Sequence, residues 1–259
     1  MPACVILGSA FADALGDWSL IPRTVKTPLG PVVLHSDPRS GGFILFRHGL
    51  PHRLLPNQIP YRAHALALRA VGCQSLLVTS SVGVLDDDVA LFTPYLLGDL
   101  LMLDNRLPDG SACTLFTEPS PRQGHLVVEQ SLFDVALSDW IARRCALSPR
   151  RLTFLYVPGP RTKTAAENRL ARSTGAEVNS MTLAPEVVLA NELEIPTAAL
   201  VIGHKRSGSR PTSAEPEVDL AGSLDRSRAA SLAVISTFLS EAPATPFANR
   251  IYRFDHKSP

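Results

Sequence analysis

The sequence predicts an α/β fold, with one domain over residues 1–259 built on a mixed, largely parallel central sheet flanked by helices. Short apolar runs alternate along the chain with segments of helical spacing, which is typical of parallel strands joined by crossover helices. Hydrophobic residues make up 45% of the chain and charged residues 19%, so disordered and fibrous classes are excluded. No internal repeat or long linker divides the chain into two domains.

The first half of the chain contains four predicted strands and one predicted helix. The apolar run ACVIL at 3–7 ends at a Gly-Ser pair and predicts a buried first strand. GGFILF at 41–46 predicts the second strand, and residues 61–71 place Ala and Leu at helical spacing. SLLVTSS at 75–81 and GDLLMLDN at 98–105 predict two further strands.

The second half continues the same alternation. Helices are predicted at 131–145, 164–172, 185–192 and 225–240, and strands at 151–157, just before Met181 and at 197–203. Two segments rich in Pro, Ser and Gly, 106–124 and 207–217, are predicted loops. Helices therefore follow most strands, and we expect them to cover both faces of the sheet.

Composition also limits the partners and the compartment. The chain carries 25 Lys+Arg against 24 Asp+Glu, a net charge of +1, so no overall positive field would attract nucleic acid. No run approaches the roughly 20 apolar residues of a membrane span. Cys4, Cys73, Cys113 and Cys145 form no CxxC pair, so we expect buried free thiols in a cytoplasmic protein. The acidic run 86–88 is read as a solvated turn rather than a metal site.

Polar residues gather at the ends of the predicted strands. These ends are Gly8-Ser9, Arg47-His48, Thr79-Ser80-Ser81, Met181-Thr182 and His204-Lys205. In such sheets ligands bind beyond the carboxyl ends of the strands. Hydroxyls, an arginine and backbone N–H groups would suit phosphate or another oxyanion. The alternative is that the hydroxyls cap helices and the arginine pairs with a carboxylate.

Seven segments carry a family resemblance in a single order along the chain. They are GSAF at 8–11, FRHGLPH at 46–52, PNQIPYRAHALAL at 56–68, VTSSVGVL at 78–85, GDLLMLDN at 98–105, GPRTKTAAENR at 159–169 and NSMTLAPEVVLANEL at 179–193. Together they resemble the trimeric branch of the nucleoside phosphorylase family, which contains purine nucleoside, methylthioadenosine and methylthioinosine phosphorylases. The resemblance covers most of residues 3–206, whereas the final 50 residues match poorly.

The resemblance implies a nucleoside phosphorylase-like fold, a homotrimer and an activity. The family cleaves the N-glycosidic bond of a nucleoside, with inorganic phosphate as co-substrate and no metal or organic cofactor. The implied phosphate-binding residues are Ser9, Arg47, His48, Ser80 and Thr182, and the implied ribose-binding residues are Ser81, Met181 and His64. Glu186 lies in the first turn of a predicted helix, where an acid complements the helix dipole. It stays outside this set, because in the family this Glu meets the ribose hydroxyls only in some members.

The implied base-binding side departs from the family pattern. It comprises Thr162, Lys163, Ser180 and Lys205, with His204 or Lys205 as the catalytic electrophile. Lys205 stands where the family has Asp or Asn, and a lysine only donates hydrogen bonds. We therefore expect a 6-oxopurine or 5′-methylthio nucleoside rather than a 6-aminopurine one. Alternatively, Lys163 and Lys205 point to solvent.

Two other functions remain open from the sequence. A catalytically altered paralogue could keep the phosphate site and bind an unusual nucleoside, or act without turnover. A hydrolase could use water in place of phosphate. The changed base-binding residues favour the first of these, and the retained phosphate-binding residues disfavour the second.

Overall fold

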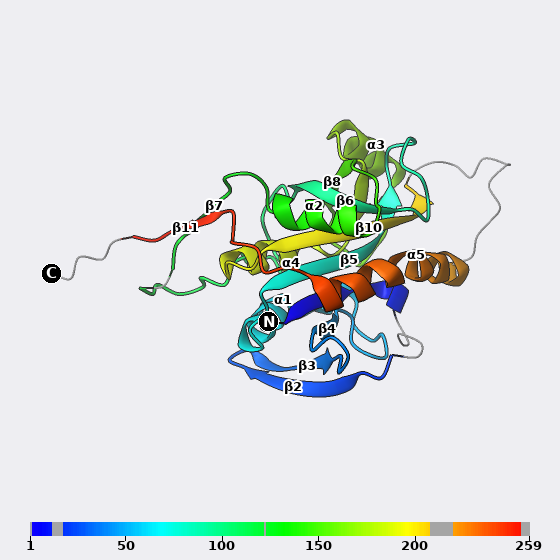
Figure 1. Ribbon diagram of the computed structural model, residues 1–259. Coiled ribbons are helices and arrows are strands. Elements are labelled where there is room, and N and C mark those ends of the chain that lie inside the picture. Colours follow the sequence, from blue (N-terminus) through cyan, green and yellow to red (C-terminus); the bar gives the residue numbers. More distant parts are fainter. Residues whose placement is uncertain (1, 12–17, 122, 208–219, 255–259) are drawn as a thin grey trace.

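A computed structural model describes residues 2–11, 18–121, 123–207 and 220–254 (Figure 1). It contains a mixed nine-stranded sheet with helices on both faces, which confirms the predicted fold class. The strands of this sheet are β1 (Ala3–Leu7), β2 (Ile21–Thr27), β3 (Gly30–Ser36), β4 (Phe43–Phe46), β5 (Ser75–Val84), β6 (Pro94–Leu101), β8 (Arg151–Tyr156), β9 (Val178–Ser180) and β10 (Thr197–Arg206). A separate two-stranded sheet pairs β7 (His125–Val127) with β11 (Arg250–Tyr252) and extends away from the main sheet (Figure 1).

The helical elements connect these strands. They are the short 3₁₀ turns η1 (Ser9–Phe11) and η2 (Pro56–Gln58), followed by α1 (Tyr61–Ala70), α2 (Val135–Arg144), α3 (Ala165–Ser173), α4 (Ala184–Glu192) and α5 (Leu220–Glu241). The start of α3 is fixed by a capping box, in which Thr164 and Glu167 each bond the other's backbone N–H. This cap holds the preceding residues Thr162 and Lys163 directly before the helix.

Five strands of the sheet form a closed ring of pairings. Strand β10 pairs with β6, β6 with β8, β8 with β9, β9 with β5, and β5 pairs back to β10. Strand β1 pairs in parallel with β5 and with β4, and β3 and β2 continue this extension as an antiparallel hairpin. The central strand β5 therefore belongs to both the closed part and the extension (Figure 1).

The edge of β5 that faces β1 changes partner along its length. Its pairing with β1 ends at Val78, and its pairing with β9 begins at Gly83. Among the described residues, no strand pairs with 79–82 on that edge. A point at which neighbouring strands separate is where open α/β sheets form a ligand crevice.

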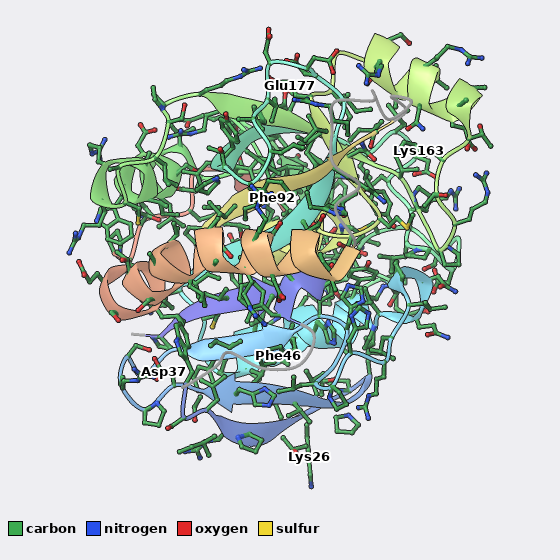
Figure 2. All side chains as sticks on the ribbon, turned by 90° about the vertical axis from the view of Figure 1, so that its right-hand side faces the viewer. Lys26, Asp37, Phe46, Phe92, Lys163 and Glu177 are labelled. Carbon is green, nitrogen blue, oxygen red and sulfur yellow. The ribbon has the colours of Figure 1, made fainter. Side chains whose placement is uncertain are left out.

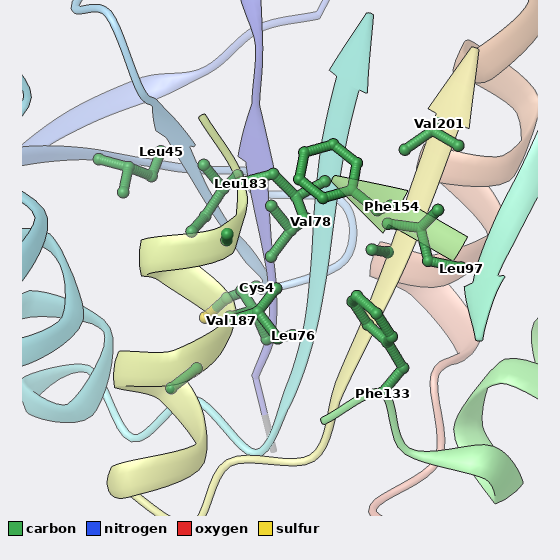
Figure 3. Packing of buried hydrophobic residues seen from close by; sticks show 14 of the residues in the cluster. Cys4, Leu45, Leu76, Val78, Leu97, Phe133, Phe154, Leu183, Val187 and Val201 are labelled. Atoms are coloured by element: carbon green, nitrogen blue, oxygen red, sulfur yellow. The ribbon is translucent and has the colours of Figure 1, made fainter. Parts of the chain in front are cut away.

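Two hydrophobic cores lie on opposite faces of the sheet. Alternate residues of β1 divide between them, with Ile6 in the core under α1 and α4 and Val5 in the core under α2 and α5. Figure 3 shows Val187 of α4 packed toward β1 and β5 in the first core. Each fully buried aliphatic side chain of this kind contributes roughly 1.5–3 kcal/mol, so the two cores hold the strand ends in fixed positions.

The predicted strand at 98–105 is wrong in its second half. Strand β6 spans Pro94–Leu101, and Met102–Asn105 form a turn in which the Asn105 N–H donates to the Met102 carbonyl. Asn105 adopts a φ of 45°, a left-handed conformation that asparagine tolerates better than most residues and that ends a strand. The apolar run alone did not reveal this turn.

Three further differences concern the edges of the sheet. The β2–β3 hairpin was not predicted, because half of its residues are exposed and only Val32 and Leu34 are buried in a core, with Val25 packed against it. Strand β10 continues past the predicted end at 203, through a register irregularity between Gly203 and Lys205, to Arg206. Of the two predicted loops, 106–124 contains no named helix or strand in its described residues, and most of 207–217 lies outside the described residues.

Other predictions from composition can be compared with the same structure. The four cysteines are free, and Cys4, Cys73 and Cys113 are buried. Asp86 and Asp87 of the acidic run pair with arginines. In the part of the chain that the structure describes, no helix has the length and hydropathy to cross a membrane, and no group of three or more His, Cys, Asp or Glu could hold a metal ion.

Candidate functional site

A cavity of about 470 Å³ lies at the carboxyl ends of β1, β4, β5, β9 and β10. Its lining includes every predicted site residue except His64, namely Ser9, Arg47, His48, Ser80, Ser81, Thr162, Lys163, Ser180, Met181, Thr182, His204 and Lys205. Residues as far apart in the chain as Ser9 and Ser207 meet here, because the parallel strands β1, β4, β5 and β10 bring their carboxyl ends to one edge. The cavity opens where β5 loses its neighbouring strand.

Hydroxyl groups form one connected group in this cavity. The Ser80 hydroxyl donates to the Ser180 hydroxyl oxygen at 3.2 Å, and the Ser180 and Thr182 hydroxyls lie 3.4 Å apart. The Thr182 N–H also donates to the Ser180 hydroxyl oxygen. Such hydroxyls can donate to the oxygens of an anion or accept from a ligand.

Arg47 reaches the same cavity while held by a buried carboxylate. Its Nε donates to Glu186 Oε1 at 2.7 Å, its Nη2 to Glu186 Oε2 at 2.5 Å, and its Nη1 to the Thr79 carbonyl at 3.0 Å. Both side chains of the ion pair are almost fully buried, so the predicted alternative of a carboxylate partner for Arg47 is also realised. Three of the five guanidinium N–H groups bond Glu186 and Thr79, and the other two have no acceptor among the described residues.

Glu186 was missed because its sequence position has another adequate explanation, the helix dipole of α4. Burial raises its pKa, and the adjacent Arg47 guanidinium limits that rise. The Glu186 carboxylate fixes the orientation of the Arg47 guanidinium through these two hydrogen bonds, so Glu186 is a positioning residue for Arg47. The only sequence signal was an acid in the first turn of a helix that otherwise reads as fully buried.

His48 is held in its neutral form. Burial, Arg47 and His52 together lower its pKa to about 4, with burial the largest cause, although its bond to the Leu54 carbonyl acts in the opposite direction. Its Nδ1 lies 2.7 Å from that carbonyl oxygen. Because a carbonyl only accepts, Nδ1 carries the proton, and Nε2 of the neutral ring is an acceptor.

Lys163 and Lys205 also line the cavity. Lys163 Nζ donates to Asn179 Oδ1, and the Asn179 amide donates to the Gly83 carbonyl at 3.0 Å and to Ser207 Oγ at 3.1 Å. Lys163 is therefore half-buried and held by β9 rather than directed to solvent. Lys205 is exposed but still lines the cavity. Sequence reasoning missed Asn179, although a polar residue within a short buried strand is a signal.

His204 lines the cavity beside these lysines. Burial, and to a smaller extent Lys205, lower its pKa to about 4. Its Nδ1 is buried and has no hydrogen-bond partner among the described residues. The ring is thus neutral near pH 7, and as an electrophile it could donate one N–H but carry no charge.

His64 lies outside the cavity, in contrast to the other predicted residues. It occupies the buried face of α1 and lines a separate small void with Tyr61 and Glu186. Burial, with smaller effects from Arg47 and His48, lowers its pKa to about 3. The helical spacing of α1 directs position 64 into the core, so we do not include His64 in the ribose-binding set.

Comparisons with known proteins bear on the family and the fold of the chain. Residues 4–240 match the family model described as "Phosphorylase superfamily". The chain is 33% identical over 217 residues, 78% of each chain, to a Thermococcus kodakarensis protein named "Probable 6-oxopurine nucleoside phosphorylase". It is 32% identical to the S-methyl-5′-thioadenosine phosphorylase of Thermofilum pendens, over 65% of this chain and 64% of that protein. A methylthioadenosine phosphorylase from Schistosoma mansoni, solved with adenine, has the same fold, with a TM-score of 0.75, 24% identity and coverage of 93% and 90% of the two chains.

Proposed function

Because this chain belongs to the phosphorylase superfamily, we propose that it is a nucleoside phosphorylase, a pentosyltransferase that cleaves a purine-type nucleoside with inorganic phosphate. The products are the free base and ribose 1-phosphate or its 5-substituted form. The observation that carries the proposal is one cavity lined both by hydroxyls with Arg47 and by further hydrogen-bond donors that include Lys163 and Lys205.

The phosphate end comprises Ser9, Arg47, His48, Ser80 and Thr182. The remaining N–H groups of Arg47 and the hydroxyls would bind phosphate oxygens. The neutral His48 would accept a hydrogen bond from the protonated oxygen of monohydrogen phosphate. Held in this way, a phosphate oxygen faces C1′ of the ribose, which converts a bimolecular encounter into a positioned attack.

The reaction transfers the ribosyl group between two partners. The C1′–N bond breaks with its electron pair moving to the base, C1′ passes through an oxocarbenium-like state, and a phosphate oxygen forms the new bond to C1′. Ser81 and Met181 would line the ribose. Gly159 supports this placement, since a Cβ at that position would lie 2.7 Å from Met181 Sδ, so only glycine lets the methionine occupy its observed position.

The base end comprises Thr162, Lys163, Ser180 and Lys205, with His204 beside them. Lysine donates and does not accept, so these groups suit the carbonyl oxygen of a 6-oxopurine better than the amino group of adenine. Either Lys205 or His204 would stabilise the negative charge that develops on the leaving base. A relative named for 6-oxopurine nucleosides supports the oxo base. A relative named for S-methyl-5′-thioadenosine, an adenine nucleoside, supports only the 5′-methylthio group.

Base release from four nucleosides, with and without phosphate, tests the proposal. We expect phosphate-dependent release from inosine, guanosine or 5′-methylthioinosine, and slower release from 5′-methylthioadenosine. Equal release in phosphate-free buffer would make the protein a hydrolase. No release from any of the four, together with thermal stabilisation by phosphate, would instead indicate the non-catalytic binding protein.

We also propose a single-domain chain that forms a cytoplasmic homotrimer and uses phosphate as co-substrate with no metal or organic cofactor. These statements rest on the family resemblance, and the net charge of +1 adds no reason to expect nucleic acid or a membrane as a partner. Light scattering coupled to gel filtration tests the trimer. Unchanged turnover after dialysis against a chelator tests the cofactor statement.

A further inference from the structure

Lysine is rare in this protein, and two of its four lysines lie at one site. The chain has 21 arginines but only four lysines, at positions 26, 163, 205 and 257. Lys163 and Lys205 both line the base end of the cavity. They come from different parts of the fold, Lys163 from the loop before α3 and Lys205 from the end of β10. The fold thus brings two ammonium groups together where the base of a nucleoside would lie.

No carboxylate in the cavity balances these two charges. Among the described residues, neither Asp nor Glu lines it. The nearby acid Glu167 accepts two hydrogen bonds from Arg161, at 2.7 and 2.8 Å. Asp87 is mostly exposed and lies 3.8 Å from Arg206. The local charge is therefore positive, and an anion bound between the two lysines would reduce their repulsion.

Lys163 is held in position by a dedicated contact. Asn179 is buried, and its amide nitrogen donates to the Gly83 carbonyl on β5 and to Ser207 Oγ after β10. Its oxygen is therefore fixed as the acceptor for Lys163 Nζ. A Cβ at position 83 would lie 2.2 Å from Ser207 Oγ, so glycine is needed for this arrangement. One ammonium N–H is used and two remain for a ligand.

The electrostatics agree with the geometry. Burial, and to a smaller extent the neighbouring Lys205, lower the pKa of Lys163, and the Glu167 carboxylate acts in the opposite direction. A bound anion would counteract both effects, because it supplies the opposite charge at short range. A neutral base would counteract neither effect.

From this arrangement, and resting on the proposed phosphorolysis, we propose that Lys163 and Lys205 select a nucleoside whose base carries a negative charge. Two kinds of purine share this chemistry: a purine dione that loses a ring proton near neutral pH, and a purine that bears a carboxylate. When the C1′–N bond breaks, its electron pair adds further negative charge to such a base. Two ammonium groups would offset that charge, whereas the single Asp or Asn of the family pattern would not.

Calorimetric binding of free bases tests this selectivity without requiring turnover. Two matched pairs are titrated into the full-length protein at saturating phosphate: xanthine against hypoxanthine, and purine-6-carboxylate against purine-6-carboxamide. We expect the anionic member of at least one pair to bind about tenfold more tightly. Selectivity in the first pair alone identifies a ring anion, and selectivity in the second alone identifies an exocyclic carboxylate.

Variants assign the effect to the lysines. Lys163→Met and Lys205→Met are each expected to reduce the selectivity severalfold, and Lys205→Arg to preserve most of it because the charge remains. Lys26→Met is the matched control, since Lys26 is an exposed lysine of β2 at the far side of the molecule from Lys163 (Figure 2). Equal binding of both members of both pairs, or selectivity that survives both Met substitutions, would overturn the proposal.

This outcome is separable from that of the proposed function. Phosphate-dependent cleavage of inosine with no preference for anionic bases would refute only the selectivity. Selective binding of anionic bases with no phosphate-dependent release from any nucleoside would refute only the phosphorylase.

Discussion

The substitution Glu186→Gln tests whether the buried carboxylate supports Arg47. It removes a charge but keeps the side-chain volume, and leaves a guanidinium that is 0% exposed without its counter-ion. Breaking a buried ion pair by removing one partner costs about 3–5 kcal/mol. Glutamine retains one acceptor for the two bonds that Glu186 now receives, so we expect a loss of about 3 kcal/mol, near the lower end of that range.

The assays are urea unfolding and thermal unfolding, each followed by tryptophan fluorescence at a fixed protein concentration. A loss of about 3 kcal/mol corresponds to a fall in Tm of roughly 6–12 °C for a chain of this size. The control is Glu241→Gln, which changes the same two-bond contact in the exposed pair of Arg144 and Glu241. Exposed pairs of this kind contribute up to about 1 kcal/mol. Equal losses for the two variants would refute the claim that burial makes the Arg47 pair structurally important.

Three further substitutions address the site and its protonation. Arg47→Ala should raise the KM for phosphate and lower turnover by about 100-fold or more, and an unchanged rate would contradict the phosphate assignment. His64→Asn should reduce the loss of folding stability at acid pH. In the unsubstituted protein the folded pKa of His64, about 3, lies below the ordinary 6.5, so its contribution to stability is present above pH 6.5 and falls by about 2 kcal/mol toward pH 5. Urea midpoints of both proteins at pH 7, 6 and 5 would detect the difference. Gly159→Ala should displace Met181 and raise the KM for the nucleoside about tenfold, with the KM for phosphate as an internal control that stays unchanged.

Much of the site could be predicted from the sequence because the ends of strands can be recognised in it. An apolar run that stops at Ser9, Arg47 or Ser80 marks both the end of a strand and the edge at which ligands gather. The structure then brought these ends together in one cavity. His64 shows the limit of such reasoning, since its segment matched the family while the rotation of α1 directs the side chain into the core.

Contacts between distant segments could not be read in the same way. The Arg47–Glu186 pair joins residues 139 positions apart, and nothing near either residue in the sequence identifies the other. Lys163 likewise owes its position to Asn179 and, through it, to Gly83 and Ser207. Nothing in the sequence near Lys163, Asn179, Gly83 or Ser207 identifies the other three.

The sequence by itself determined the fold class, the family and the residue types at the strand ends. These follow from local periodicity and from the order of motifs, both of which can be recognised in the sequence without knowledge of contacts in space. The tertiary structure alone decided that β5 changes partner between Val78 and Gly83, that Glu186 holds Arg47, and that Lys163 faces the cavity rather than solvent. The physical reason is that pairing partners, burial and the field around a charge are set by neighbours in space, and those neighbours lie far apart along the chain.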